Sequence, residues 1–130
     1  MLAKKILSTA FRFIGIPYIF NAQPYQSKNF DCSSFIQYIF HVNGIFLPRN
    51  SRQQFLVGEE IAFHQIQKGD LLFFTTSNRR NKKGLSKIGH VALYIGNNQI
   101  IHTFRDGKKV TVSDLSPYWN TVLIGAKRVF

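Results

Sequence analysis

The chain is 130 residues long, which predicts one domain with a single core over residues 1–130. Its residues are 45% hydrophobic and 18% charged, which excludes a disordered chain, and no apolar run approaches the ~18 residues that a membrane span needs. The net charge of +11 favours an anionic partner, such as nucleic acid, an anionic lipid surface or an anionic cell wall.

The first expected element is an amphipathic helix over residues 4–14, because apolar side chains recur there at helical spacing. Gly15 and Pro17 follow and end it. The same stretch faintly resembles a signal peptide, but Arg12 interrupts the apolar run and no small-residue cleavage site follows. We therefore expect a helix here, with export through a leader removed earlier or by another route.

The second expected helix begins at the only cysteine, Cys32, and ends at Asn43 and Gly44. Asp31 is the expected N-cap. The first turn of a helix favours a thiolate through its free N–H groups and dipole, whereas the adjacent Asp31 carboxylate opposes it. A lone cysteine is usually a small buried hydrophobe, and it excludes an internal disulfide or a cysteine-built zinc site. Its partners therefore decide its role.

The second half of the chain predicts strands. After a short third helix near residues 48–54, strands are expected at 71–74, 90–95, 99–104, 110–112 and 122–130. Helices followed by strands predict an α+β fold, with N-terminal helices packed on a roughly five-stranded antiparallel sheet.

Four histidines could supply a base for the cysteine. His41 lies 41 − 32 = 9 positions along the same helix, ~13 Å away, so it cannot reach. His64 lies in a polar connection and is expected at the surface. His90 begins a strand after Gly89, and His102 follows 102 − 90 = 12 residues later, across the expected hairpin. His90 is therefore the expected base.

Whether His90 and His102 share a face depends on the hairpin loop, because side chains alternate along strands. A three-residue loop over residues 96–98 sets His102 opposite Ala92 and makes the two histidines diagonal neighbours. A bulge also gives a shared face. A two-residue loop at residues 97–98 places them on opposite faces.

A shared face gives a Cys-His-His triad. Cys32 attacks a carbonyl, His90 takes its proton and later gives it to the leaving amine, and His102 orients the His90 imidazole. A satisfied strand histidine is the alternative for His102. The triad predicts that a thiolate–imidazolium pair forms at a pH below ~8.5, the pKa of a free thiol.

Positive charge gathers in a basic segment, with no acidic residue over 71–105. Its cations are Arg79, Arg80, Lys82, Lys83 and Lys87. No RNP motif, zinc-knuckle spacing or helix-turn-helix pattern is present, so nucleic acid is not expected. A solvated loop and a site for an anionic cell-wall polymer both stay open. The remaining histidines and acidic residues lack ligand spacing, so neither metal nor cofactor is expected.

Seven segments in chain order resemble motifs of the NlpC/P60 family of cell-wall cysteine peptidases. They are Pro17-Tyr18, residues 31–38 (Asp-Cys-Ser-Ser-Phe-Ile-Gln-Tyr), 47–51, 68–74, 89–96, 101–102 and 125–129. The resemblance implies a papain-like fold with the catalytic residues Cys32, His90 and His102. It also implies hydrolysis of peptidoglycan stem peptides, typically at the bond between D-γ-glutamate and the diamino acid.

The resemblance further implies that Tyr18, Asp31 and Ser33 help to form the substrate end of the site. The alternatives are a core ring for Tyr18 and an N-cap alone for Asp31. Where the family usually has Trp-Gly-Gly, this chain has residues 20–22, Phe-Asn-Ala, and Ser34 replaces a glycine. Both departures affect the binding cleft rather than the triad.

Two other functions stay open on this reading. The first is a thiol amidase or acyltransferase on the same fold, because an acyl-enzyme permits either outcome. The second is a non-catalytic basic module that binds wall polymers. In each case the expected location is the cell envelope or the extracellular space.

Overall fold

The computed structural model describes residues 2–130. Helices come first and strands follow. The elements are α1 (Leu2–Phe11), α2 (Cys32–His41), α3 (Ser51–Gln54), β1 (Glu59–Glu60), η1 (Phe63–Gln65), β2 (Leu71–Phe74), η2 (Gly84–Lys87), β3 (His90–Gly96), β4 (Gln99–His102), β5 (Thr111–Asp114), α4 (Tyr118–Val122) and β6 (Leu123–Arg128).

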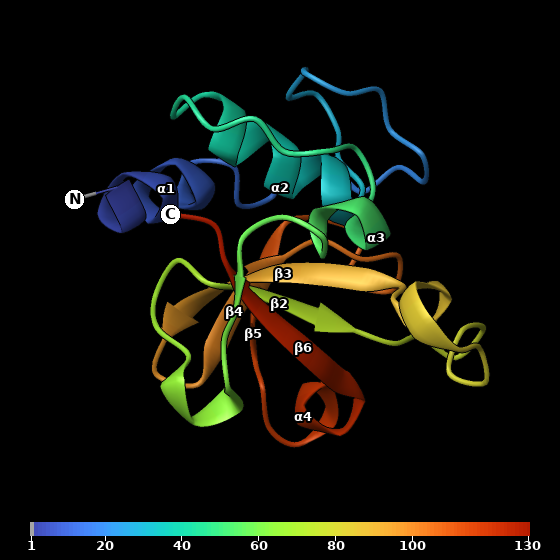
Figure 1. The fold of residues 1–130 in the computed structure, drawn as a ribbon. Helices are drawn as coiled ribbons and strands as arrows, with labels where there is room; N and C mark the ends of the chain where they lie inside the picture. The colour runs from blue at the N-terminus through green and yellow to red at the C-terminus, as the bar shows by residue number, and fades with distance from the viewer. Residues whose placement is uncertain (1) are drawn as a thin grey trace.

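The strands form one antiparallel sheet in the order β1-β6-β2-β3-β4-β5. Helices α1 to α3 cover one face and α4 lies against the other (Figure 1). The α+β prediction is confirmed, with six strands in place of about five. The additional strand, β1, is two exposed glutamates, too short and too polar to give an alternating pattern.

Both faces of the central strands are buried, which explains their unbroken apolar sequence. On the helical face, residues such as Phe73, Val91 and Leu93 pack against the apolar sides of α1 and α2. On the other face, Phe74 and Ala92 pack with the side chains around α4. The alternation of side chains thus assigns neighbouring residues of β2 and β3 to different layers.

The first helix is shorter than predicted. It ends at Phe11, not near residue 14, because the next amides bond three residues back instead of four, as with Phe13 N–H to the Ala10 carbonyl at 3.1 Å. Gly15 then takes a φ of +95° and donates its N–H to the Val110 carbonyl, which ties the chain to the β5 side. Within residues 2–130, no helix is long and apolar enough to cross a membrane.

The end of the chain also differs from the prediction. Instead of one strand over 122–130, residues Tyr118–Val122 form α4 and the strand begins at Leu123. The fourth strand, β4, ends at His102, two residues earlier than expected.

The hairpin between β3 and β4 combines a two-residue turn with a bulge. Asn97 and Asn98 both have positive φ, +52° and +61°, as a type I′ turn requires. Gly96 pairs with Gln99, but Tyr94 pairs with Ile100, so Ile95 is the extra residue. The two-residue turn alone would separate the histidines, and the bulge gives them the shared face, as expected of a bulge from the sequence.

Candidate active site

The cysteine lies at the N-terminus of α2, as predicted. Asp31 caps the helix: its Oδ1 accepts from the Ser34 N–H at 2.9 Å, and the Asp31 N–H donates to Ser34 Oγ at 2.9 Å. This reciprocal capping box explains why a serine fits where the family pattern has glycine. The first turn of the helix is therefore fixed, and Cys32 with it.

The sulfur of Cys32 lies beside the start of β3. The backbone N–H groups of Val91 and Ser33 are near enough to the sulfur to lower its pKa, and Val91 directly follows His90 in the strand. The helix α2 packs against β3, which holds the cysteine and this end of the strand together. The predicted nucleophile and base are thus neighbours in space although they are far apart in sequence.

His90 and His102 are hydrogen-bonded to each other. His90 Nε2 lies 2.8 Å from His102 Nδ1, and both side chains are buried. His102 Nε2 lies 2.9 Å from Ser113 Oγ on β5. A thiol partner requires a lone pair on His90 Nδ1, so Nε2–H of His90 donates to His102 and Nε2–H of His102 donates to Ser113.

Ser113 is a site residue that the sequence reasoning missed. It belongs to a strand with no motif, and only the pairing of β4 with β5 brings it to His102. Ser113 sits directly opposite Ile100 in that pairing, and Thr111 sits opposite His102. Sequence offers no signal for such a diagonal contact.

Aromatic rings enclose the histidine pair. Trp119 stacks on His90 at 5.1 Å between centroids, and Phe104 stacks on His102 at 4.8 Å. Phe74 contacts His90 from the neighbouring strand at 5.6 Å. These rings exclude water from the imidazoles and hold their orientation.

Burial governs the protonation of the site. It raises the pKa of Cys32 to about 11; burial comes first and the Asp31 charge second, and together they outweigh the backbone groups of Val91 and Ser33 and the charge of Arg49. Burial lowers the pKa of His90 to about 3, and burial together with the His90 charge lowers that of His102 to about 2. The thiol pKa is therefore shifted in the direction opposite to the predicted lowering, and all three shifts favour the neutral forms of the thiol and the imidazoles.

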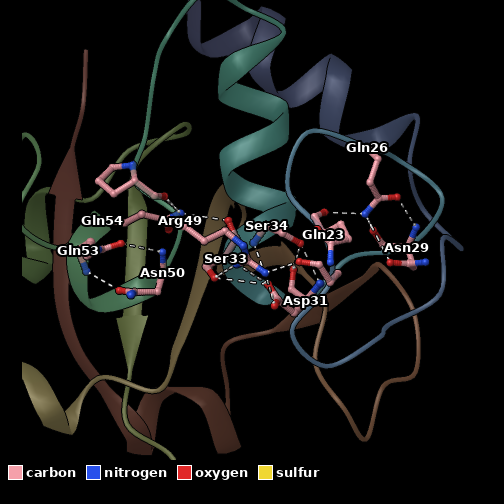
Figure 2. A network of polar contacts seen from close by, with 12 residues as sticks. Gln23, Gln26, Asn29, Asp31, Ser33, Ser34, Arg49, Asn50, Gln53 and Gln54 are labelled. Carbon is pink, nitrogen blue, oxygen red and sulfur yellow. Dashed lines mark hydrogen bonds and ion pairs between the residues drawn. The ribbon is translucent and has the colours of Figure 1, made fainter.

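Arg49 joins Asp31 and Ser33, two of the three predicted substrate residues, into one network, drawn in Figure 2. Its guanidinium contacts both carboxylate oxygens of Asp31, at 3.1 and 2.7 Å, and donates to Ser33 Oγ at 2.9 Å and to the Ala22 carbonyl at 2.6 Å. Asp31 is therefore both an N-cap and an ion-pair partner, not an N-cap alone. The role of Arg49 was missed, although it stands in the Leu-Pro-Arg segment that carries part of the resemblance.

Tyr18 is near the same carboxylate and the thiol. Burial raises its pKa first, and the charges of Cys32 and Asp31 raise it further, which places the phenol within their field. Tyr18 is held by bonds on both sides: its N–H donates to the Lys108 carbonyl, and the next residue, Ile19, bonds to Phe30. The three predicted substrate residues therefore all lie near the cysteine.

The Phe-Asn-Ala replacement keeps the backbone geometry that glycine allows. Asn21 has a φ of +58°, a region that asparagine tolerates better than most residues. Ala22 is buried and supplies the carbonyl that Arg49 binds, while Phe20 is 72% exposed. The departure thus changes the surface of the cleft and leaves its backbone intact.

The remaining histidines lie elsewhere. His41 is exposed at the end of α2 and packs on Tyr25 at 4.8 Å, and His64 is exposed in η1. Among residues 2–130, no group of three or more histidines, cysteines or acidic residues is arranged to hold a metal ion.

Helices on one face of an antiparallel sheet, with a cysteine at a helix N-terminus beside a histidine pair, define a papain-like arrangement. A model of the NlpC/P60 family matches residues 15–128, more than half of the chain. The chain therefore belongs to the NlpC/P60 family.

Two Bacillus subtilis relatives illustrate the similarity. A gamma-DL-glutamyl hydrolase is 38% identical over 95% of this chain, and a gamma-D-glutamyl-L-lysine dipeptidyl-peptidase is 32% identical over 88%. The chain spans only 28% and 36% of the lengths of these relatives.

Solved structures agree with the fold. A NlpC/P60 family protein from Bacillus cereus matches with a TM-score of 0.85 and 34% identity, over 98% of this chain and 40% of that one. The NlpC/P60 domain of the peptidoglycan hydrolase SagA matches with a TM-score of 0.78 and 28% identity, over 97% of both chains.

Proposed function

We propose that this chain is a cysteine endopeptidase that cleaves peptidoglycan stem peptides between D-γ-glutamate and the diamino acid. Cys32 is the nucleophile, His90 the base and His102 the residue that orients it. The observation that carries the proposal is the 2.8 Å bond between His90 Nε2 and His102 Nδ1, which leaves His90 Nδ1 for the thiol. The relatives named for γ-glutamyl bonds support the choice of bond.

The reaction proceeds through a thioester. The Cys32 thiol gives its proton to His90 Nδ1 as the sulfur bonds to the γ-carbonyl carbon. The C–N bond then breaks, and the leaving amine takes the proton from His90. Water, losing a proton to His90, hydrolyses the thioester, and that proton returns to the sulfur.

Because thiol and imidazole are both neutral in the closed site, the proton moves only when the carbonyl is in place. The imidazolium that forms on His90 is stabilised by its bond to His102, which accepts through Nδ1. Negative charge that develops near Cys32 is favoured by the N-terminal end of α2. Substrate binding thus creates the ion pair that the free thiol lacks.

The acyl half of the substrate binds on the side of Asp31, Ser33 and Tyr18. Arg49 holds the Asp31 carboxylate by a two-point contact, so the carboxylate has a fixed direction toward a free substrate amine. Tyr18 and Ser33 offer hydroxyl groups beside it. A free amine at this end restricts cleavage to peptides already trimmed from the glycan.

A second candidate substrate is a γ-linked glutamyl chain. The specific observations are the relative named gamma-DL-glutamyl hydrolase and the net charge of +11, which attracts a polyanion. Both substrates have the same γ-glutamyl amide and require the same chemistry. They differ in the group that leaves.

The basic segment at Arg79, Arg80, Lys82, Lys83 and Lys87 is proposed to hold the enzyme near an anionic cell-wall polymer. Within residues 2–130, these cations form no ion pair, so their charge is available to a partner. The proposed substrates place the enzyme in the cell envelope or outside the cell.

The test is mass spectrometry of defined muropeptides incubated with the wild type and with Cys32→Ala. We expect a product that ends in γ-D-glutamate with the wild type only. Products joined to an added amine would instead identify an acyltransferase, and released free ammonia an amidase. Intact peptides with both proteins, together with wall binding lost on neutralising the basic segment, would identify a binding module.

A further inference from the structure

A pocket lies between the end of β2, the basic segment and α4, and the proposed mechanism makes no use of it. Its volume is about 430 Å³, within the range of small-ligand sites. Its walls include three hydroxyl residues that follow β2 and two cations of the basic segment. The lining residues include Thr75, Thr76, Ser77, Arg80, Lys87 and Tyr118.

Two walls of the pocket are each one residue from His90. Phe74 is paired with His90 across β2 and β3, and Thr75 is the next residue along the chain. On the other side, the ring of Tyr118 packs on Trp119 at 5.1 Å, and Trp119 in turn stacks on His90. The pocket therefore lies one residue away from His90 on two sides, through Phe74 and Trp119, and none of its lining residues belongs to the capping network of α2.

This position assigns the pocket to the leaving half of the substrate. His90 gives its proton to the leaving amine, so the leaving residue extends from the His90 side of the cysteine. The acyl half lies toward Asp31 and Arg49. This step rests on the proposed function.

The chemistry of the pocket fits a carboxylate. Arg80 and Lys87 line it, and among its described lining residues none is acidic. Thr75 is 8% exposed, and its Oγ1 is buried without a hydrogen-bond partner. A buried hydroxyl without a partner is costly, and rotation about its Cα–Cβ bond turns the donor toward an occupant.

We propose that the pocket lined by Thr75, Arg80 and Lys87 binds a carboxylate of the leaving residue, so that this enzyme favours an acidic leaving group over L-lysine. meso-Diaminopimelate carries such a carboxylate on its side chain, and a γ-linked glutamate carries one on its α-carbon. The preference differs from the one in the name of the lysine-specific relative.

A carboxylate can come from two places on the leaving group: a side chain or the end of the peptide. The test therefore uses γ-D-glutamyl peptides with three different leaving residues: meso-diaminopimelate, meso-diaminopimelate with its side-chain carboxylate amidated, and L-lysine. Each peptide is made in two forms, with a free C-terminal carboxylate and with a C-terminal amide. A γ-linked glutamate oligomer completes the set. A preference for the side-chain carboxylate then appears between meso-diaminopimelate and its side-chain amide. A preference for the terminal carboxylate appears between the free acid and the terminal amide of the same peptide.

We expect kcat/KM for the diaminopimelate peptide to exceed that for the lysine peptide by about 5- to 20-fold at fixed ionic strength. Arg80→Gln combined with Lys87→Gln should remove this preference, so that the ratio of kcat/KM for the two peptides falls to about one. Thr75→Val keeps the shape of the side chain and should by itself reduce the preference. Lys68→Gln removes an exposed charge at the opposite end of β2 and should change nothing.

Equal rates for acidic and neutral leaving groups, or a preference that persists in the double variant, would overturn the inference and leave the proposed function standing. If no peptide is cleaved, the proposed function fails, and a binding measurement then tests the pocket separately. In ¹⁵N-labelled Cys32→Ala protein, meso-diaminopimelate should shift the amides of residues 75–77 and 87, and L-lysine should not. No such shift would overturn the pocket assignment independently of catalysis.

Discussion

The two sides of Cys32 are built by different means. On one side, His90 and His102 are buried under Trp119 and Phe104, and their contact depends on strand register. On the other side, Asp31 and its partners form a polar network from the start of α2 and the loops around it.

In the proposed function, the histidine side carries out the proton transfers and the Asp31 side binds the substrate. Burial on the histidine side removes water and fixes two rings, so one change there affects proton transfer. The network around Asp31 is partly open to solvent, with the Arg49 side chain 29% exposed, so one change there affects binding and stability. Single substitutions on each side should therefore fail in different ways.

The largest expected effect is on the histidine side. His90→Gln keeps the approximate size of the side chain and removes the proposed base, so kcat/KM should fall by about 10³-fold or more. The measurement is peptide cleavage followed by mass spectrometry, with circular dichroism as a check on folding. His41→Gln, an exposed histidine at the far end of α2, should retain full activity, and appreciable cleavage by His90→Gln would contradict the role of this residue.

On the network side, Arg49→Gln should lower both activity and stability. It leaves the Asp31 carboxylate with its cap but without its ion pair, at a cost of about 1–3 kcal/mol in the free energy of unfolding. Arg128→Gln is the matched control, because Arg128 binds Asp70 at 2.9 Å with a side chain that is 28% exposed. Both variants should lose stability in denaturant titrations, but only Arg49→Gln should lose kcat/KM.

The Asp31 charge also opposes ionisation of Cys32. Since that charge raises the pKa of the thiol, Asp31→Asn should lower it, and the thiolate fraction at pH 8–9 should rise. Iodoacetamide should then label Cys32 severalfold faster even as peptide cleavage falls. Glu60→Gln is the control, because Glu60 lies on β1, three strands from β3 in the sheet, and this variant should be labelled at the wild-type rate. Slower labelling of Asp31→Asn would show that the cap matters more than the charge.

The smallest expected effect is at Ser113. Ser113→Ala removes the acceptor for His102 Nε2–H, so the correct tautomer is less favoured and kcat should fall by about 3- to 10-fold with KM unchanged. The imidazolium of His90 is then less stabilised, so the acid limb of the pH profile should move to lower pH. Ser113→Thr should restore both, and Ser116→Ala should alter neither; an unshifted profile would reduce Ser113 to a packing residue.

Several features of the site followed from local sequence. Asp31 before an apolar-periodic run predicted a capped helix with Cys32 in its first turn, and capping is decided by residues within one turn. The strand at 71–74 was predicted with its observed bounds, because an apolar run after a Gly-Asp turn has few alternatives. The choice of His90 over His41 needed only helix geometry.

Other features could not be reached from local sequence. The bulge at Ile95, which decides whether His102 faces His90, leaves no mark in the residue pattern. Arg49, Ser113 and Trp119 act through contacts between segments far apart in the chain. The thiol pKa was predicted in the wrong direction, because the helix terminus is visible in the sequence and the burial that outweighs it is not.

The sequence by itself determined the order of the main helices and strands, without β1 and α4, together with the capped cysteine and the candidate histidines, since propensity, capping and alternation act over a few residues. Only the tertiary structure decided the register of the β3–β4 hairpin, the burial of the imidazoles and the ion pair that directs Asp31. These depend on which distant segments share a face and exclude water, and that is settled when the sheet and helices pack together.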